Sequence, residues 1–183
     1  IRWSHDLLTD DERVTFRRLA VFSGPFDPTD AVEVDGGHAH VVTAALDRLV
    51  EGSLLAASSD GRLLFLETVR AFAEDRLDES GETSSVRDRH LVWVLARAEA
   101  IVPGFDGPEP ASAATTARRL LNDARAAIHH AEQTSQAAAI WQLVGYLAPL
   151  CFYDGLIDEA LGWAARAAAV DDGTHPDATA PGL

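Results

Sequence analysis

The first residues carry a clear helix start signal followed by helical hydrophobic periodicity. Thr9 stands just before an apolar-periodic segment and Glu12 follows three residues later, which is the signature of a capping box. Acidic side chains fill the first turn, as the helix dipole favours. The apolar positions continue to Phe22, and Ser23-Gly24-Pro25 ends the pattern. We therefore expect a helix from about residue 10 to residue 22.

Two further helices are expected before residue 53. Asp27-Pro28-Thr29-Asp30 is a second capping signal, and it predicts a short helix that reaches about Val34. After a turn at residues 35–37, apolar side chains recur at helical spacing until Gly52, which ends the third helix. These core positions are Val41, Val42, Ala45, Leu46, Leu49 and Val50.

A β-hairpin and a closing helix complete this part of the chain. Short apolar runs at 53–57 and 62–65 flank Ser58-Ser59-Asp60-Gly61, and an Asp-Gly turn between such runs predicts a hairpin. Residues 66–77 then place apolar side chains on one side of a helix. Three helices, a hairpin and a closing helix form, in that order, a winged-helix fold.

Beyond residue 80 the sequence is alanine-rich and helical throughout. Helices are expected at 84–102, 113–133, 135–153 and 156–170. Pro103-Gly104 should stop the first of them, and Pro149 should kink the third. Small residues along these helices let neighbours pack closely, which favours an antiparallel, tetratricopeptide-like array.

The expected fold is therefore mainly α. A winged-helix domain with a small β-hairpin occupies residues 1–80, with the boundary at Ser80-Gly81-Glu82. A helical, tetratricopeptide-like domain follows at 81–170, and residues 171–183 read as a flexible tail or linker. The chain begins inside a patterned segment without an initiator Met, which suggests a piece of a longer polypeptide.

Composition excludes several kinds of chemistry. All fifteen basic residues are arginine, so the chain has neither the lysine of a P-loop nor an amine for a Schiff base. The single cysteine, Cys151, rules out a disulfide framework and a cysteine metal cluster. No nucleophile, base and orienting group converge in the sequence, so we expect no catalytic residues and no bound cofactor or metal.

The acidic balance bears on nucleic-acid binding. The net charge is −14, and residues 1–80 hold eight arginines against sixteen acidic residues. A surface of that sign repels a phosphate backbone, so direct DNA binding by this segment is not expected. No apolar run reaches the roughly 20 residues that span a bilayer, and no signal peptide opens the chain, so we expect no membrane contact and a cytoplasmic location.

Some residues invite a functional interpretation of their own. His38 and His40 could share a metal ion, but no third ligand stands at a recognisable spacing. His129 and His130 point in different directions on a helix. Aromatic side chains in helical arrays either pack in the core between helices or act as anchors in a binding groove. The sequence allows both interpretations. The candidate groove aromatics are Trp141, Tyr153 and Trp163.

Several stretches resemble one protein family. Trp3–Leu8 (WSHDLL) and Arg18–Phe26 (RLAVFSGPF) resemble the opening of the winged-helix domain in bacterial STAND regulators, the signal-transduction ATPases of the AfsR, SARP and large LuxR type related to NB-ARC proteins. Leu46–Leu55 (LDRLVEGSLL) and Leu64–Leu77 (LFLETVRAFAEDRL) are similar to later segments of that domain. The likeness continues more weakly to about residue 133.

The resemblance implies an intramolecular partner. Proteins of this family hold a nucleotide-binding domain, with ATP or ADP, before the winged helix and a helical sensor array after it. In NB-ARC relatives a Met-His-Asp motif reaches the ADP, and the aligned positions here are Phe65, Leu66 and Glu67. Leucine cannot donate a hydrogen bond to a phosphate, so nucleotide sensing is not carried over. Glu67 and Arg70 remain possible interdomain contacts.

The leading hypothesis is a non-catalytic regulatory and protein-interaction segment of a multidomain signal-transduction ATPase that controls transcription. The winged helix would pack on the absent nucleotide-binding domain, and the helical repeats would sense an unknown protein or small-molecule effector. One alternative is a DNA-binding winged helix with a helical dimerisation domain, which predicts a common basic face for Arg13, Arg17, Arg18 and Arg48. The other is a freestanding helical-repeat adaptor.

Overall fold

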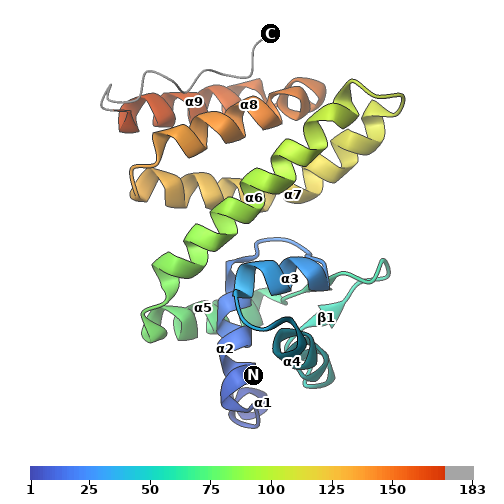
Figure 1. The fold of residues 1–183 in the computed structure, drawn as a ribbon, viewed down its shortest axis with the longest axis vertical. Helices are drawn as coiled ribbons and strands as arrows, with labels where there is room; N and C mark the ends of the chain where they lie inside the picture. Colours follow the sequence, from blue (N-terminus) through green and yellow to red (C-terminus); the bar gives the residue numbers. More distant parts are fainter. Residues whose placement is uncertain (172–183) are drawn as a thin grey trace. The chain divides into compact units, whose positions relative to one another are not determined.

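The protein is mainly helical and folds into two compact units. The computed structural model describes residues 1–171, and its units are Ile1–Trp93 and Val94–Leu183 (Figure 1). Within the described residues, the sheet is a single two-stranded antiparallel hairpin. The mainly α fold with a small β-hairpin predicted from the sequence is therefore confirmed.

The first unit follows the predicted order of elements. Two short segments bracket its first core helix: α1 (Arg2–Asp6) before it and the 3-10 helix η1 (Leu19–Val21) after it. The remaining elements are α2 (Asp10–Arg18), α3 (Pro28–Asp35), α4 (Ala39–Glu51), β1 (Ala56–Ala57), β2 (Leu63–Leu64), α5 (Glu67–Ser80) and the first turns of α6 (Thr83–Phe105).

The capping box predicted at Thr9 is present, and the capping signal at Asp27 also forms a capping box. The Thr9 amide donates to the Glu12 carboxylate at 2.8 Å, and the Glu12 amide donates to the Thr9 hydroxyl at 3.4 Å. At the start of α3, the Asp27 amide donates to Asp30 Oδ2 at 3.1 Å. These contacts satisfy backbone donors that the first turn of each helix leaves open.

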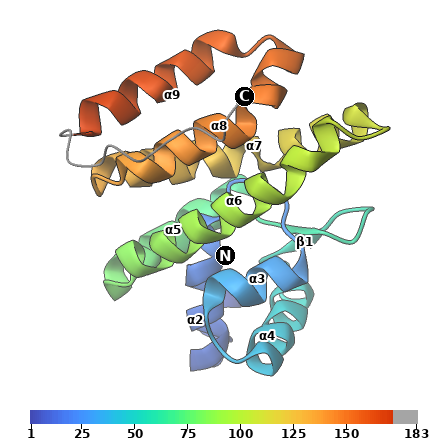
Figure 2. The ribbon, with the colours of Figure 1, turned by 45° about the horizontal axis from the view of Figure 1, so that its top comes forward.

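The hairpin is shorter than the apolar runs that predicted it. Ala56 pairs with Leu64 and Ala57 with Leu63, and Gly61 supplies the left-handed turn with φ +82°. Phe26 adds a bridge to Leu63 in which each residue donates to the other at 2.9 Å. Figures 1 and 2 both show the hairpin projecting from the first unit beside α3.

Aromatic side chains fill the core of the first unit. Phe16, Phe22 and Phe26 are fully buried, and the rings of Phe22 and Phe26 stack with their centroids 4.3 Å apart. The buried face of α4 joins this core from the other side of the fold, with α4 packed against α2 and α3. Its buried residues are Val42, Ala45, Leu46 and Leu49.

The second unit is an array of helices, and it corrects one prediction. The later turns of α6 continue through Pro103 to Phe105, although Pro103-Gly104 was expected to stop the helix. A proline removes only one backbone donor, and tertiary packing holds the last turn here. A Cβ on Gly104 would approach Ala113 Cβ to 2.9 Å, so the end of α6 lies directly against the next helix.

Three more helices complete the array. They are α7 (Pro110–Gln133), α8 (Ala137–Asp154) and α9 (Ile157–Val170), and α8 packs against both of its neighbours. Gly155 ends α8 in the left-handed conformation, with φ +72°. Pro149 lies inside α8, and Pro110 occupies the first turn of α7, where proline is readily accommodated.

The division between the two compact units falls after Trp93, whereas the predicted boundary is at residue 80. The first turns of α6 belong to the first unit because Arg89, His90 and Trp93 reach into it. Of the predicted tail 171–183, only Asp171 lies among the described residues, directly after α9.

Candidate functional site

The helix–turn–helix pair α3–α4 is built around a tight turn. Gly36 ends α3 with φ +75°, and the Gly37 amide donates to Asp35 Oδ1 at 3.0 Å. His38 directly precedes α4. The burial of one face of α4 fixes the rotation of this helix about its axis. The opposite face of α4 is therefore presented to solvent.

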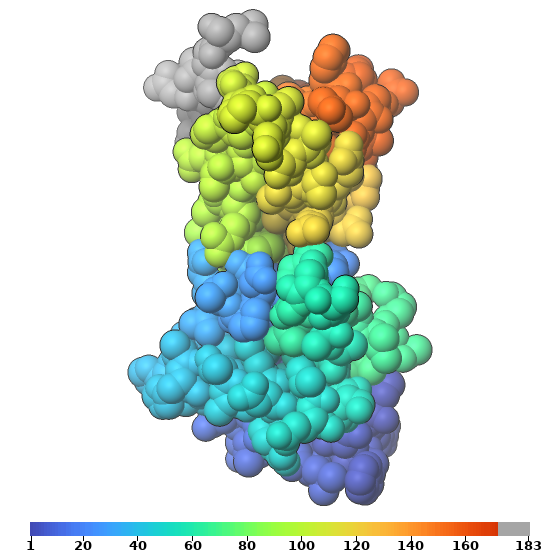
Figure 3. All heavy atoms as spheres, turned by 90° about the vertical axis from the view of Figure 1, so that its right-hand side faces the viewer, coloured from blue at the N-terminus to red at the C-terminus, as the bar shows by residue number. Residues whose placement is uncertain are grey.

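The exposed side of this helix pair is acidic. Asp47 and Glu51 lie on the exposed face of α4, together with its one arginine, Arg48. The Arg48 guanidinium is bound to the Glu51 carboxylate and lies 3.8 Å from a Glu12 oxygen. Figure 3 shows a side of the first unit on which α4 and the hairpin, in light blue to green, form much of the visible surface.

The hairpin tip neutralises its own arginine. Arg62 Nε donates to Asp60 Oδ2 at 2.9 Å, and the Ser58 hydroxyl donates to Asp60 Oδ1 at 2.5 Å. The hydrogen bond from Ser58, followed by the one from Arg62, holds the pKa of Asp60 well below its usual range. The tip of this hairpin thus presents a closed ion pair.

The arginines expected on a common basic face are each engaged with carboxylates. Arg17 Nε and Arg18 Nη2 donate to opposite oxygens of Glu82, at 2.8 and 2.5 Å. Arg13 lies 3.2 Å from Asp10, and Arg48 is paired with Glu51. Arg17 and Arg18 therefore turn toward the start of α6, away from the exposed face of α4.

A partly buried charge cluster surrounds the start of α6. Arg89 donates to the carbonyls of Val34 and Asp35, at 2.8 and 3.0 Å, at the end of α3. Arg18 lies 3.6 Å from the Asp35 carboxylate, which is almost fully buried. Burial, followed by the nearby Arg18, lowers the pKa of Arg89, whereas the hydrogen bond from Arg18 lowers the pKa of Glu82.

The interdomain candidates lie at the start of α5. Glu67 is exposed, and the adjoining Leu66 is 55% exposed despite its apolar side chain. Arg70 Nη2 donates to Glu67 at 3.1 Å, and Nη1 bonds to Glu74. The structure thus brings Glu67 and Arg70 together as neighbours on one helix, with the apolar Leu66 beside them.

The three candidate groove aromatics have different surroundings. Trp163 is only 4% exposed and packs in the interior of the helical array, whereas Trp141 is half-buried. Tyr153 is 53% exposed, and the Arg118 guanidinium lies 6.0 Å from its ring centroid. They do not gather as one exposed set, and Tyr153 remains the accessible member.

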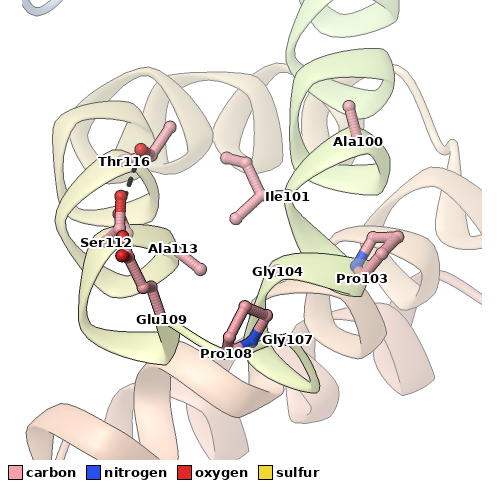
Figure 4. A pocket seen from close by; sticks show the side chains of 10 residues that line it. All are labelled: Ala100, Ile101, Pro103, Gly104, Gly107, Pro108, Glu109, Ser112, Ala113 and Thr116. Carbon is pink, nitrogen blue, oxygen red and sulfur yellow. Dashed lines mark hydrogen bonds between the residues drawn. The ribbon is translucent and has the colours of Figure 1, made fainter.

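A shallow pocket lies between the end of α6 and the start of α7. Its volume is about 580 Å³, and Figure 4 shows Ile101 and Ala113 on its apolar side. Glu109, Ser112 and Thr116 supply polar atoms, although the Thr116 hydroxyl is already bonded to the Ser112 carbonyl at 3.1 Å. No sequence signal marked this pocket, because it depends on packing between two helices.

Residues 1–171 contain neither a cluster of metal ligands nor a membrane-spanning helix. The rings of His38 and His40 stack with their centroids 5.9 Å apart, but this part of the chain holds no group of three or more potential ligands. Within the same residues, every helix is too short or too polar to cross a bilayer.

The comparison with protein families concerns the first unit. Residues 8–78 match the family described as "Winged helix-turn-helix domain". This stretch is a winged-helix domain. In it α3 and α4 form the helix–turn–helix pair and β1–β2 form the wing, in agreement with the fold expected from the sequence.

Curated relatives extend the similarity over most of the chain. The chain is 34% identical over 169 residues to the "Putative HTH-type transcriptional regulator Rv0890c" of Mycobacterium tuberculosis and to a Mycobacterium bovis protein of the same description. This alignment covers 89% of the chain but only 19% of the relatives. The "Uncharacterized protein Rv0894" of M. tuberculosis is 33% identical over 97 residues, which are 49% of this chain and 25% of that protein.

The chain thus spans about a fifth of the length of the first of these relatives. These relatives are described as transcriptional regulators. No solved structure matches the chain.

Proposed function

We propose that this chain is the winged-helix and helical-array part of a larger, cytoplasmic transcriptional regulator. The support is the match of residues 8–78 to a winged helix-turn-helix domain and the 34% identity to regulators about five times as long. Its role in such a protein is regulatory and non-catalytic.

Within that role, the winged helix makes a protein contact. The observation that carries this proposal is the charge of the exposed helix–turn–helix surface. Arg48 is the one arginine among the exposed residues of α3 and α4, and it is already bound to Glu51. The exposed acids are Asp27, Glu33, Asp47 and Glu51. Phosphate binding depends on free cationic side chains, so such a surface fits a protein partner better than a DNA backbone.

The partner that we propose is a nucleotide-binding domain of the same polypeptide. The resemblance to STAND regulators supports this choice, and so does the exposed apolar Leu66 beside Glu67 and Arg70 at the start of α5. ATP or ADP would be held by that domain, because this chain has no lysine for a P-loop. The winged helix would keep the ATPase inactive until an effector reached the helical array.

The ATPase rate of the full-length protein tests this proposal. Leu66→Asp places a charge on the apolar contact and should raise the basal rate several-fold. Ala71→Asp is the matched control because it places the same charge at an exposed position one turn into α5, and it should leave the rate unchanged. Equal rates for the wild type and both variants would remove the support for an inhibitory contact at Leu66.

DNA binding is the second candidate function, and the comparisons favour it. The matched family and the names of the relatives both carry the helix-turn-helix description. If α4 enters a DNA groove, the 183-residue chain should bind duplex DNA, and Arg48→Glu should weaken binding and reduce its salt slope by about one. If the winged helix contacts protein, fluorescence anisotropy should show no salt-dependent binding at about 10 μM chain, within the usual non-specific range.

A further inference from the structure

The outer side of α9 is apolar and exposed. Its inner side buries Trp163 and Ala167. At 100° per residue, a second row of apolar positions falls on a different side of the helix, and each of them is exposed. This row, the outer stripe of α9, consists of Ile157, Leu161, Ala165 and Ala168.

The preceding helix carries a similar second row. The outer stripe of α8 has the helical spacing i, i+4, i+7, i+11 and contains no polar side chain. Its first two members are half-buried and its last two are exposed, with Phe152 80% exposed. They are Trp141, Gly145, Ala148 and Phe152.

These stripes differ from ordinary scattered surface residues. A helix with two apolar sides is typical of one that packs between neighbours on both sides. Phe152, Leu161 and Ile157 are 80%, 62% and 44% exposed and come from adjoining turns of one helical hairpin. No described residue covers them, whereas the inner sides of α8 and α9 are well packed against each other.

We propose that the outer stripes of α8 and α9 are the docking surface for an amphipathic helix of the same, longer polypeptide that lies outside these 183 residues. The curated relatives support this occupant because they are about five times as long as the chain, which covers only 19% of them. A tethered helix acts at an effective concentration of about 1 mM, well above that of a separate copy of the chain. This inference does not depend on what the winged helix binds.

The stripes also specify the chemistry of the docking helix. The part of that helix that lies over Ala165 and Ala168 needs large apolar side chains, which fill the space above alanine. The part that lies over Leu161 and Ile157 needs small residues, which allow a close approach. An arginine in this second part would complement the exposed Asp158.

Peptide-resolved hydrogen exchange tests the docking surface in the chain of 183 residues and in the full-length protein. The α9 peptide should exchange at least about tenfold more slowly in the full-length protein. Leu161→Asp should abolish that difference. Val92→Asp is the matched control, because Val92 is 64% exposed against 62% for Leu161, and it should preserve the protection.

Three results would overturn the proposal. One is equal exchange of α9 in the two proteins, which would mean that no other part of the full-length protein covers it. Another is a concentration-dependent dimer of the 183-residue chain, seen by sedimentation, that dissociates in Leu161→Asp. That result would assign the surface to a second copy of the chain. The third is protection that survives Leu161→Asp in a protein whose helicity is unchanged by circular dichroism.

Discussion

Trp93 Nε1 donates a hydrogen bond to Asp30 Oδ1 at 3.0 Å, and both side chains are buried. Asp30 is also the residue that closes the capping box of α3 through its other carboxylate oxygen. One side chain therefore fixes the start of α3 and receives the indole of α6. Because buried polar groups are costly without partners, this contact ties the first turns of α6 to the helix–turn–helix pair of the first unit.

Trp93→Phe should lower the free energy of unfolding by about 1–3 kcal/mol, since it keeps an aromatic ring and removes the donor to a buried carboxylate. Urea unfolding followed by circular dichroism measures the loss. Trp141→Phe is the control, because Trp141 is only half-buried, and its effect should be smaller. Equal losses in the two variants would contradict a special role for the bond to Asp30.

Glu82→Gln should destabilise the first unit by about 1–2 kcal/mol, because Glu82 accepts charge-assisted hydrogen bonds from both Arg17 and Arg18. The control is Glu79→Gln, which removes a more exposed carboxylate paired with Arg76 on the same helix. That change should cost less than about 1 kcal/mol. Chemical unfolding of the two variants in parallel gives the comparison.

The stability difference between the wild type and Glu82→Gln should depend on pH. The hydrogen bond from Arg18 lowers the pKa of Glu82 in the folded state, so the folded protein binds fewer protons at this site than the unfolded chain. The stabilisation is complete above the unfolded pKa of a glutamate and is lost as the pH falls through the lowered folded pKa. The difference in stability between wild type and Glu82→Gln should therefore shrink on acidification, and a difference that grows would contradict the assignment.

Local signals made most of the first unit predictable. Thr9 and Glu12 lie three residues apart, so the sequence itself shows that both partners of the capping box are present. The Asp60-Gly61 turn likewise needs only its immediate neighbours to specify a hairpin. The element order that follows from such short-range features is the order that the structure has.

The candidate site was much less predictable, because its contacts are distant in sequence. Arg17 and Glu82 are 65 residues apart, and nothing in their local sequence shows that they pair. The sequence alone allows Arg17 and Arg18 to lie either on an exposed basic face or in a partly buried ion-pair cluster. Only the tertiary structure shows that they belong to the cluster. The extension of α6 past Pro103 has a similar cause, since its last turn is held by packing at Gly104.

Gly36→Ala should cost more stability than Gly81→Ala, although both glycines have a left-handed backbone, with φ +75° and +74°. The backbone penalty of about 1–2 kcal/mol applies to both. At Gly36, a new Cβ would also come within 3.0 Å of Arg89 Nε, which donates to the Val34 carbonyl, whereas the space at Gly81 is open. Thermal unfolding of the two variants should show the larger loss for Gly36→Ala, and equal losses would mean that Arg89 moves aside freely.

Trp163→Ala should open a cavity in the helical array and lower the stability of the second unit by about 3–5 kcal/mol, because the indole is 4% exposed. Tyr153→Ala, at a side chain 53% exposed, should cost less than about 1 kcal/mol. Since the chain has two units, hydrogen exchange of peptides from α8 and α9 reports the loss more directly than a single global transition. Unchanged exchange in Trp163→Ala would show that this indole does not support the core, and would restore it as a candidate anchor in a binding groove.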